Sequence, residues 1–118
     1  MNESGESGAV RSAVLLSGDL MFASRVRGAA EAAGLDFQMA GALPDKQGIE
    51  FVIVDLATRS SVVDGLMDSC RRICPQARVI AFGPHVQVAR LDDARAAGIP
   101  VVLTRGQFDR ELGGLFEE

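Results

Sequence analysis

A single carboxylate stands where a buried strand is expected to end. Residues 51–54 (Phe-Val-Ile-Val) are four consecutive apolar residues, and Asp55 follows them directly. A short apolar run bounded by turn-prone residues is typical of a strand buried on both faces, as in the middle of a parallel sheet. Open α/β sheets place their sites at the carboxyl ends of such strands. Asp55 is therefore the first candidate for chemistry, and what it can do depends on its neighbours.

The other residues with reactive side chains have simpler interpretations. Asp19 follows an apolar run at 13–16 and fits the N-cap of the next helix better than a metal site. Cys70 and Cys74 are four residues apart in a predicted helix, where two thiols make neither a good disulfide nor a zinc site. We expect them to be two small buried side chains. His85 follows Gly-Pro in a loop and is expected to be solvated.

Apolar runs alternate with helix-like segments along the chain. Strands are predicted at 13–16, 36–40, 51–54, 78–82 and 99–103, and helices at 20–33, 62–73, 86–97 and 107–116. The helix at 62–73 is expected to begin at a cap formed by Ser60 and Ser61 and to end before Pro75. Residues 41–50 contain Pro44 and Gly48, which predicts a loop or at most one helical turn. This alternation predicts an α/β fold with right-handed crossovers and a parallel sheet covered on both faces.

Length, charge and hydropathy argue against a nucleic-acid-binding protein and against a membrane protein. The chain has 118 residues, which suits one domain, predicted at 10–118 after a polar, disordered tail at 1–9. The net charge is −4, which argues against a basic nucleic-acid interface. No apolar run approaches the roughly 18 residues of a membrane span, and the N-terminus is polar and acidic rather than signal-like. We therefore expect a cytoplasmic protein with neither nucleic acid nor membrane as partner.

The order of the predicted elements resembles that of the receiver domains of bacterial two-component response regulators. The similarity covers about residues 10–116 and is clearest at 51–56 (Phe-Val-Ile-Val-Asp-Leu), 64–66 (Asp-Gly-Leu), 78–82 (Arg-Val-Ile-Ala-Phe) and 94–99 (Ala-Arg-Ala-Ala-Gly-Ile). The last stretch is similar to the A-x-x-A-G-A pattern that receivers place before their fifth strand. The resemblance implies a doubly wound, flavodoxin-like parallel sheet of five strands in the order 2-1-3-4-5. Because 41–50 is short, the second helix is expected to be shortened or missing.

The resemblance also assigns positions to a site, and most of them are degenerate. Asp55 matches the aspartate that receivers phosphorylate. The two acidic positions fall on Ser17 and Gly18 with Asp19 displaced by one, the hydroxyl position on Gly83 and the lysine position on Arg105. Mg²⁺ needs several oxygen ligands, so it remains an option only where Asp19 bends toward Asp55, and we expect no cofactor. Without a metal, Asp55 is expected to form an ion pair with Arg105.

These departures favour a pseudo-receiver, which is not an enzyme but a signalling module that acts through protein–protein interaction without phosphorylation. Its expected partner is a sensor kinase or another signalling protein, and a homodimer is a further option. One alternative is an atypical receiver phosphorylated on Asp55 by a histidine kinase. Another is a small flavodoxin-like domain that binds a nucleotide or flavin, although residues 17–19 (Ser-Gly-Asp) lack a glycine-rich phosphate loop. Only two residues follow Phe116, so we expect a stand-alone module or a piece of a longer protein.

An interaction surface is expected on the last two helices, on the face that receivers commonly use for dimers and partners. The helix at 86–97 has more apolar positions than one inward stripe needs, and the last helix adds further Phe and Leu residues. We predict that some of these side chains, with Leu91, Phe108 and Leu112 foremost, form an exposed apolar patch. The alternative is that the Phe and Leu side chains of the short last helix pack inward.

Overall fold

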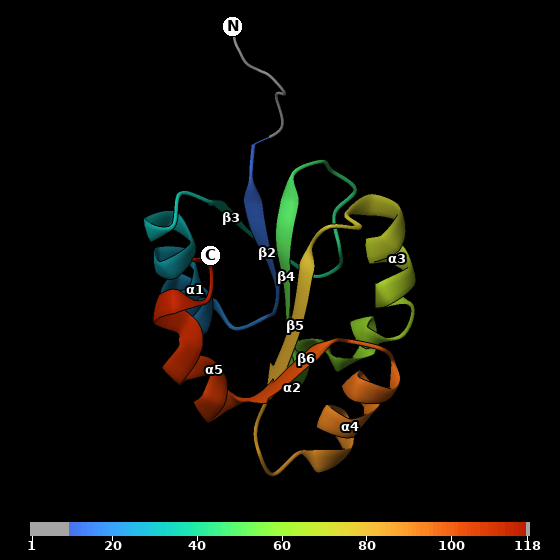
Figure 1. The fold of residues 1–118 in the computed structure, drawn as a ribbon. Coiled ribbons are helices and arrows are strands. Elements are labelled where there is room, and N and C mark those ends of the chain that lie inside the picture. The colour runs from blue at the N-terminus through green and yellow to red at the C-terminus, as the bar shows by residue number, and fades with distance from the viewer. Residues whose placement is uncertain (1–9, 118) are drawn as a thin grey trace, which may run out of the picture.

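Five parallel strands form the centre of the molecule (Figure 1). The computed structural model describes residues 10–117, so the tail predicted at 1–9 lies outside the described residues. The strands are β2 (Ser12–Leu16), β3 (Asp36–Ala40), β4 (Ile49–Asp55), β5 (Arg78–Gly83) and β6 (Val101–Thr104). Neighbouring strands are parallel in the order β3-β2-β4-β5-β6, which confirms the predicted doubly wound sheet.

The register of the strands brings the predicted site positions to one end of the sheet. Leu16, the last residue of β2, pairs with Val54, and Asp55 pairs with Phe82 on β5. Ser17, Asp55 and Gly83 therefore lie beside one another where these strands end. This end, with the loops that leave it, is called the carboxyl end of the sheet below.

Helices cover both faces of the sheet. The α-helices are α1 (Leu20–Ala32), α2 (Leu56–Arg59), α3 (Leu66–Ile73), α4 (Val88–Ala96) and α5 (Arg105–Glu111), and the 3₁₀ helices are η1 (Ser60–Val63) and η2 (Leu112–Gly114). Figure 1 shows α1 and α5 on one face and α3 and α4 on the other. Each face has its own apolar core, because the strands alternate their side chains between the two layers. Among the described residues, no helix has the length and apolar character needed to cross a membrane.

The connection between β3 and β4 contains no helix in residues 41–48, as predicted. The face of β3 that a second helix would cover presents Gln38 and Ala40, which are polar or small. Phe37 and Met39, the larger apolar residues of β3, instead pack on the opposite face against the α1 layer. The strand therefore needs no helix on that side, since little apolar surface would remain uncovered.

The third predicted helix begins later than its sequence suggests. Residues 60–63 form η1 and not the first turn of a helix capped by Ser60 and Ser61, so that part of the prediction is wrong. Gly65 precedes α3 with φ +79°, a left-handed conformation that interrupts helical geometry and that glycine adopts without a steric penalty. The helix ends at Ile73, before Pro75, as predicted.

The last helix begins at Arg105, two residues earlier than predicted. Thr104 Oγ1 accepts from the backbone N–H of Gln107, and the Gln107 side chain accepts from the N–H of Thr104, which forms a capping box. The lysine position therefore lies in the first turn of a helix and not at the end of a strand.

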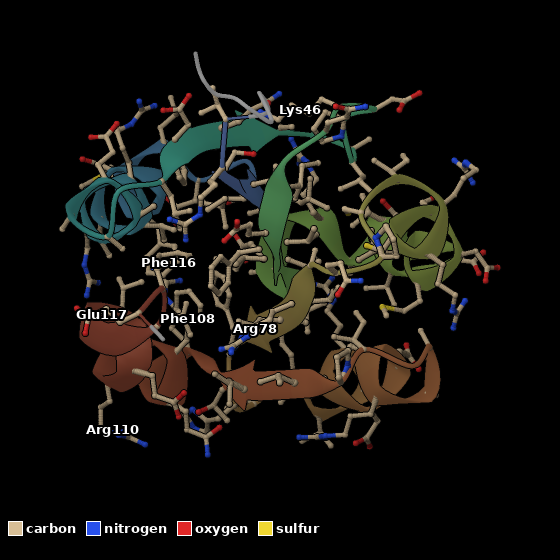
Figure 2. All side chains as sticks on the ribbon, turned by 45° about the horizontal axis from the view of Figure 1, so that its top comes forward. Lys46, Arg78, Phe108, Arg110, Phe116 and Glu117 are labelled. Carbon is tan, nitrogen blue, oxygen red and sulfur yellow. The ribbon has the colours of Figure 1, made fainter. Side chains whose placement is uncertain are left out.

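The predicted exposure of Leu91, Phe108 and Leu112 is wrong, because all three side chains are buried. Phe108 stacks on Phe82 with ring centroids 4.4 Å apart. Figure 2 shows Phe108 directed toward the interior while Arg110 points away from the molecule. Leu91 packs in the other layer, on the face of α4 that meets the sheet. The inward alternative holds, because the last helix is amphipathic and its apolar residues complete a core.

Candidate functional site

Asp55 is the most deeply buried charged residue at the carboxyl end of the sheet, with 2% of its surface exposed. Ser17 Oγ donates a hydrogen bond to Asp55 Oδ2 at 2.8 Å, and Thr58 Oγ1 donates to the same oxygen at 2.9 Å. The backbone N–H of Ala57 donates to Oδ1 at 3.0 Å, which makes Asp55 the N-cap of α2. Both carboxylate oxygens are therefore engaged by donors of the protein itself, as a buried carboxylate requires.

The two hydroxyl groups that bind Asp55 also hold the neighbouring loops. The N–H of Gly18 donates to Thr58 Oγ1 at 2.9 Å, and the N–H of Asp19 donates to Ser17 Oγ at 3.0 Å. Each hydroxyl thus accepts from the β2–α1 loop and donates to the carboxylate. The loop after β2 and the turn of α2 are joined directly over Asp55.

The residues at the acidic positions fit Mg²⁺ poorly. Asp19 is the N-cap of α1, and its Oδ1 accepts from the N–H of Phe22 at 3.0 Å, which confirms the predicted cap. Gly18 has no side chain, and the Ser17 hydroxyl already bonds Asp55 and Asp19. Mg²⁺ requires near-octahedral oxygen ligands, and the oxygens that could serve are already bound to N–H and O–H donors.

The hydroxyl position is closed by packing as well as by the loss of the hydroxyl. Gly83 is buried at the end of β5, and a Cβ atom there would lie 3.2 Å from Leu56 Cβ and 3.7 Å from Leu91 Cδ2. Leu56 is fully buried directly after Asp55. The space next to the carboxylate that a Ser or Thr would use is therefore filled by an aliphatic side chain.

The predicted ion pair between Asp55 and Arg105 does not form. The Arg105 guanidinium lies over the ring of Phe22, with its Cζ 4.0 Å from the ring centroid, and 5.9 Å from that of Phe82. Arg105 belongs to α5, and its side chain turns toward α1 because an aromatic face is available there. Hydroxyl and N–H donors, not a cation, stabilise the buried carboxylate.

Arg59 lies across two backbone segments beside the covered carboxylate. A Cβ atom on Gly18 would lie 3.1 Å from Arg59 Nη1, and one on Gly41 would lie 3.7 Å from Nε. The same Nη1 donates to the carbonyl oxygen of Thr58 at 2.9 Å. Sequence reasoning missed both Thr58 and Arg59. The only signal for Thr58 was a hydroxyl residue three positions after a strand-end acid, a spacing that allows local capping.

The cysteines are as expected. Both are free and buried, on the inner side of α3 and at its end. Burial, together with the neighbouring Cys74, raises the pKa of the Cys70 thiol to about 12. His85 is exposed in the loop before α4, as predicted.

Comparison with known proteins gives matches among solved structures alone, since no family model and no curated protein matches the chain. A response regulator receiver domain from Clostridium thermocellum superposes with a TM-score of 0.66 at 13% identity, over 91% of each chain. A CheY-like response regulator from Mesorhizobium loti gives 0.64 at 14% identity, over 92% of this chain and 100% of that one. The chain has the receiver fold.

A third matching structure carries a phosphorylated aspartic acid. A response regulator from Burkholderia pseudomallei, solved with a phosphorylated aspartic acid and calcium, has the receiver fold with a TM-score of 0.64 at 19% identity, over 80% of this chain and 59% of that one. At such identities the shared receiver fold carries no function with it. A function for this chain therefore has to be inferred from the side chains at the carboxyl end of the sheet.

Proposed function

We propose that this chain is a pseudo-receiver, a signalling module with the receiver fold that binds protein partners without a phosphoryl switch. The observation that carries the proposal is the covered carboxylate of Asp55, bound by Ser17, Thr58 and the N–H of Ala57. The partner is a signalling protein of the cytoplasm, such as a sensor kinase.

The requirements of phosphoryl transfer explain why a covered Asp55 points to this function. The nucleophilic oxygen has to approach the phosphorus in line with the leaving group, and the charge on the transferring oxygens has to be neutralised. Here Oδ2 faces two hydroxyl groups, and Arg105 lies on Phe22. The hydroxyl that would bond a phosphoryl oxygen is replaced by Gly83 against Leu56.

One observation favours the atypical receiver as a second candidate. Asp55 keeps its place at the end of the central strand β4, and breaking the bonds from Ser17 and Thr58 would free its Oδ2, while Oδ1 would still accept from the N–H of Ala57. A flavodoxin-like nucleotide or flavin site has less support. The N–H groups of Gly18 and Asp19, which would have to bind a phosphate after β2, already donate to Thr58 and Ser17.

Beryllofluoride, a stable mimic of the aspartyl phosphate, tests the proposal directly. We expect that ¹⁵N-labelled protein titrated with beryllofluoride and Mg²⁺ shows unchanged amide signals for Gly18, Ala57 and Thr58. The Asp55→Asn variant is the control for binding elsewhere. Saturable shifts of these signals that Asp55→Asn abolishes would instead establish the atypical receiver. A flavin or nucleotide that co-purifies with the protein would establish the third candidate.

A further inference from the structure

Two arginines, Arg59 and Arg90, lie beside α2 at the carboxyl end of the sheet. Arg90 Nη1 donates to the carbonyl oxygens of Leu56 and Ala57 at 3.2 and 3.3 Å, and Arg59 Nη1 donates to that of Thr58. Because these carbonyls belong to consecutive residues, the two guanidinium groups flank the same short turn. Within residues 10–117, no carboxylate lies within ion-pair distance of Arg59 or Arg90.

Arg59 and Arg90 place two positive charges at the carboxyl end of the sheet in a chain whose net charge is negative. The net charge of the protein is −4. At the carboxyl end, Asp55 is covered and Asp19 is occupied in capping α1. Arg59 and Arg90 use only Nη1 in their hydrogen bonds to the carbonyls, which leaves further N–H groups of each fork to bind a carboxylate.

Exposed apolar side chains lie on the two helices whose N-terminal segments are bonded to the α2 turn. Leu20 and Met21, at the start of α1, are 77% and 85% exposed. Val86 and Val88, at the start of α4, are 74% and 58% exposed. The bond from Gly18 to Thr58 joins the loop before α1 to the turn of α2, and the bonds from Arg90 join α4 to the same turn. Figure 1 shows α2 beside α4 where the strands end.

We infer that this strip, defined as Leu20, Met21, Arg59, Arg90, Val86 and Val88, binds an acidic segment of a protein partner that also carries apolar side chains. Carboxylates of the partner pair with Arg59 and Arg90, and its apolar residues cover the leucine, methionine and valines of the strip. A small anion would use the arginines alone and leave the apolar side chains exposed. Arginine and methionine are enriched at protein interfaces, and exposed apolar side chains beside them add surface that a partner can bury. The inference rests on the proposed function, since it names the surface through which the pseudo-receiver would act.

A model peptide in which glutamates alternate with leucines tests the inference. We expect it to shift the amide signals of Met21, Thr58 and Val88 in ¹⁵N-labelled protein, with an affinity that falls as salt is added. The double variant Arg59→Gln, Arg90→Gln should weaken binding about tenfold, the effect of two exposed ion pairs. Arg95→Gln is the matched control, because Arg95 lies on the same helix and pairs with Asp92. If the double variant loses the dispersed spectrum of a folded protein, the single variant Arg90→Gln replaces it in the binding measurement.

Several results would overturn the inference. The peptide would cause no shift at these amides, or the double variant would bind it as tightly as the unmodified protein does. A peptide with lysine in place of glutamate would bind equally well, or inorganic phosphate alone would cause the same shifts. A dimer in sedimentation that Arg90→Gln dissociates would replace the acidic partner with a second copy of the chain. The beryllofluoride titration on the same sample separates the two proposals. If neither the peptide nor beryllofluoride binds, the inference about this surface is rejected and the proposed function stands. If beryllofluoride binds, the proposed function itself is rejected.

Discussion

Asp55 shows how a single buried charge organises its surroundings. Its carboxylate accepts three hydrogen bonds, and two of the three donors are hydroxyl groups that also accept an N–H from the β2–α1 loop. A charge without such partners would be costly to bury. The aspartate thus has a structural role that needs no phosphate. Under the proposed function, the geometry that stabilises Asp55 also closes it to a phosphoryl donor.

Removal of one hydroxyl should reveal this structural role. We predict that Ser17→Ala lowers the free energy of unfolding by roughly 1–3 kcal/mol, because a buried carboxylate loses a donor and the N–H of Asp19 loses its acceptor. Urea unfolding followed by circular dichroism measures the effect. Ser24→Ala, on the exposed surface of α1, is the control and should change stability by less than about 0.5 kcal/mol. Equal stability of the two variants would mean that Ser17 does not support Asp55.

Cys70 should be unreactive in the folded protein. Burial raises the pKa of its thiol to about 12, so at pH 8 almost none of the nucleophilic thiolate is present. Iodoacetamide at pH 8 should modify neither Cys70 nor Cys74 on the time scale on which it modifies both in urea, as mass spectrometry would show. Rapid labelling of the native protein would contradict the buried position of this pair.

The same pKa shift gives stability a dependence on pH. In the unfolded chain the thiol of Cys70 titrates near its ordinary value of 9.0, whereas in the folded protein it keeps its proton to about pH 12. The folded state therefore binds more protons in this window. We predict that the contribution of Cys70 to stability is complete below about pH 8 and is lost as the pH rises toward 12. Cys70→Ala should remove this part of the alkaline loss in urea titrations at several pH values.

At the level of elements, glycines decide where helices begin and end. Gly65 takes a left-handed conformation before α3, whereas Gly28 lies inside α1 on its exposed side, where an added Cβ would meet no atom within 4 Å. We predict opposite effects of the same substitution. Gly65→Ala should destabilise the protein by roughly 1 kcal/mol, and Gly28→Ala should stabilise it by roughly 0.5–1 kcal/mol. Thermal unfolding compares them, and a shift of the same sign in both would contradict the assigned backbone conformations.

Features encoded within a few residues could be predicted from the sequence. The apolar run at 51–54 predicted β4, Asp19 predicted the cap of α1, and Pro44 with Gly48 predicted the loop before β4. The start of α3 was missed because the sequence alone does not distinguish a glycine inside a helix from a glycine that precedes one. Only its left-handed φ, which depends on the turn after Asp55, interrupts the helix.

Features that depend on contacts between elements could not be predicted. The inward packing of Leu91, Phe108 and Leu112 follows from how much of the sheet α4 and α5 cover, which an apolar pattern alone does not give. The position of Arg105 on Phe22 depends on α1 and α5 lying side by side. The sequence pattern named the degenerate site positions, but the donors that bind Asp55, above all Thr58, come from the fold of the α2 turn.

The whole molecule combines a receiver fold that lacks a helix between β3 and β4 with an Asp55 carboxylate covered by protein donors. Each face of the sheet carries an apolar core, and the aromatic stack of Phe82 and Phe108 joins β5 to α5 beneath the carboxyl end of the sheet. The fold therefore keeps its core while Asp55 is held by hydroxyl groups and N–H donors. Under the two proposals above, this module would present to its partner a surface whose charged groups are Arg59 and Arg90.

Incubation with acetyl phosphate and Mg²⁺, followed by intact-mass measurement, tests the central claim that the site at Asp55 is closed. We predict that the mass of the native protein remains unchanged, because Ser17 and Thr58 cover the carboxylate and no metal-binding cluster of His, Cys, Asp or Glu side chains is found within residues 10–117. A phosphorylatable receiver treated in parallel shows that the reagent is active. A stoichiometric phosphoryl adduct that disappears in Asp55→Asn would contradict the account and establish this chain as an atypical but functional receiver.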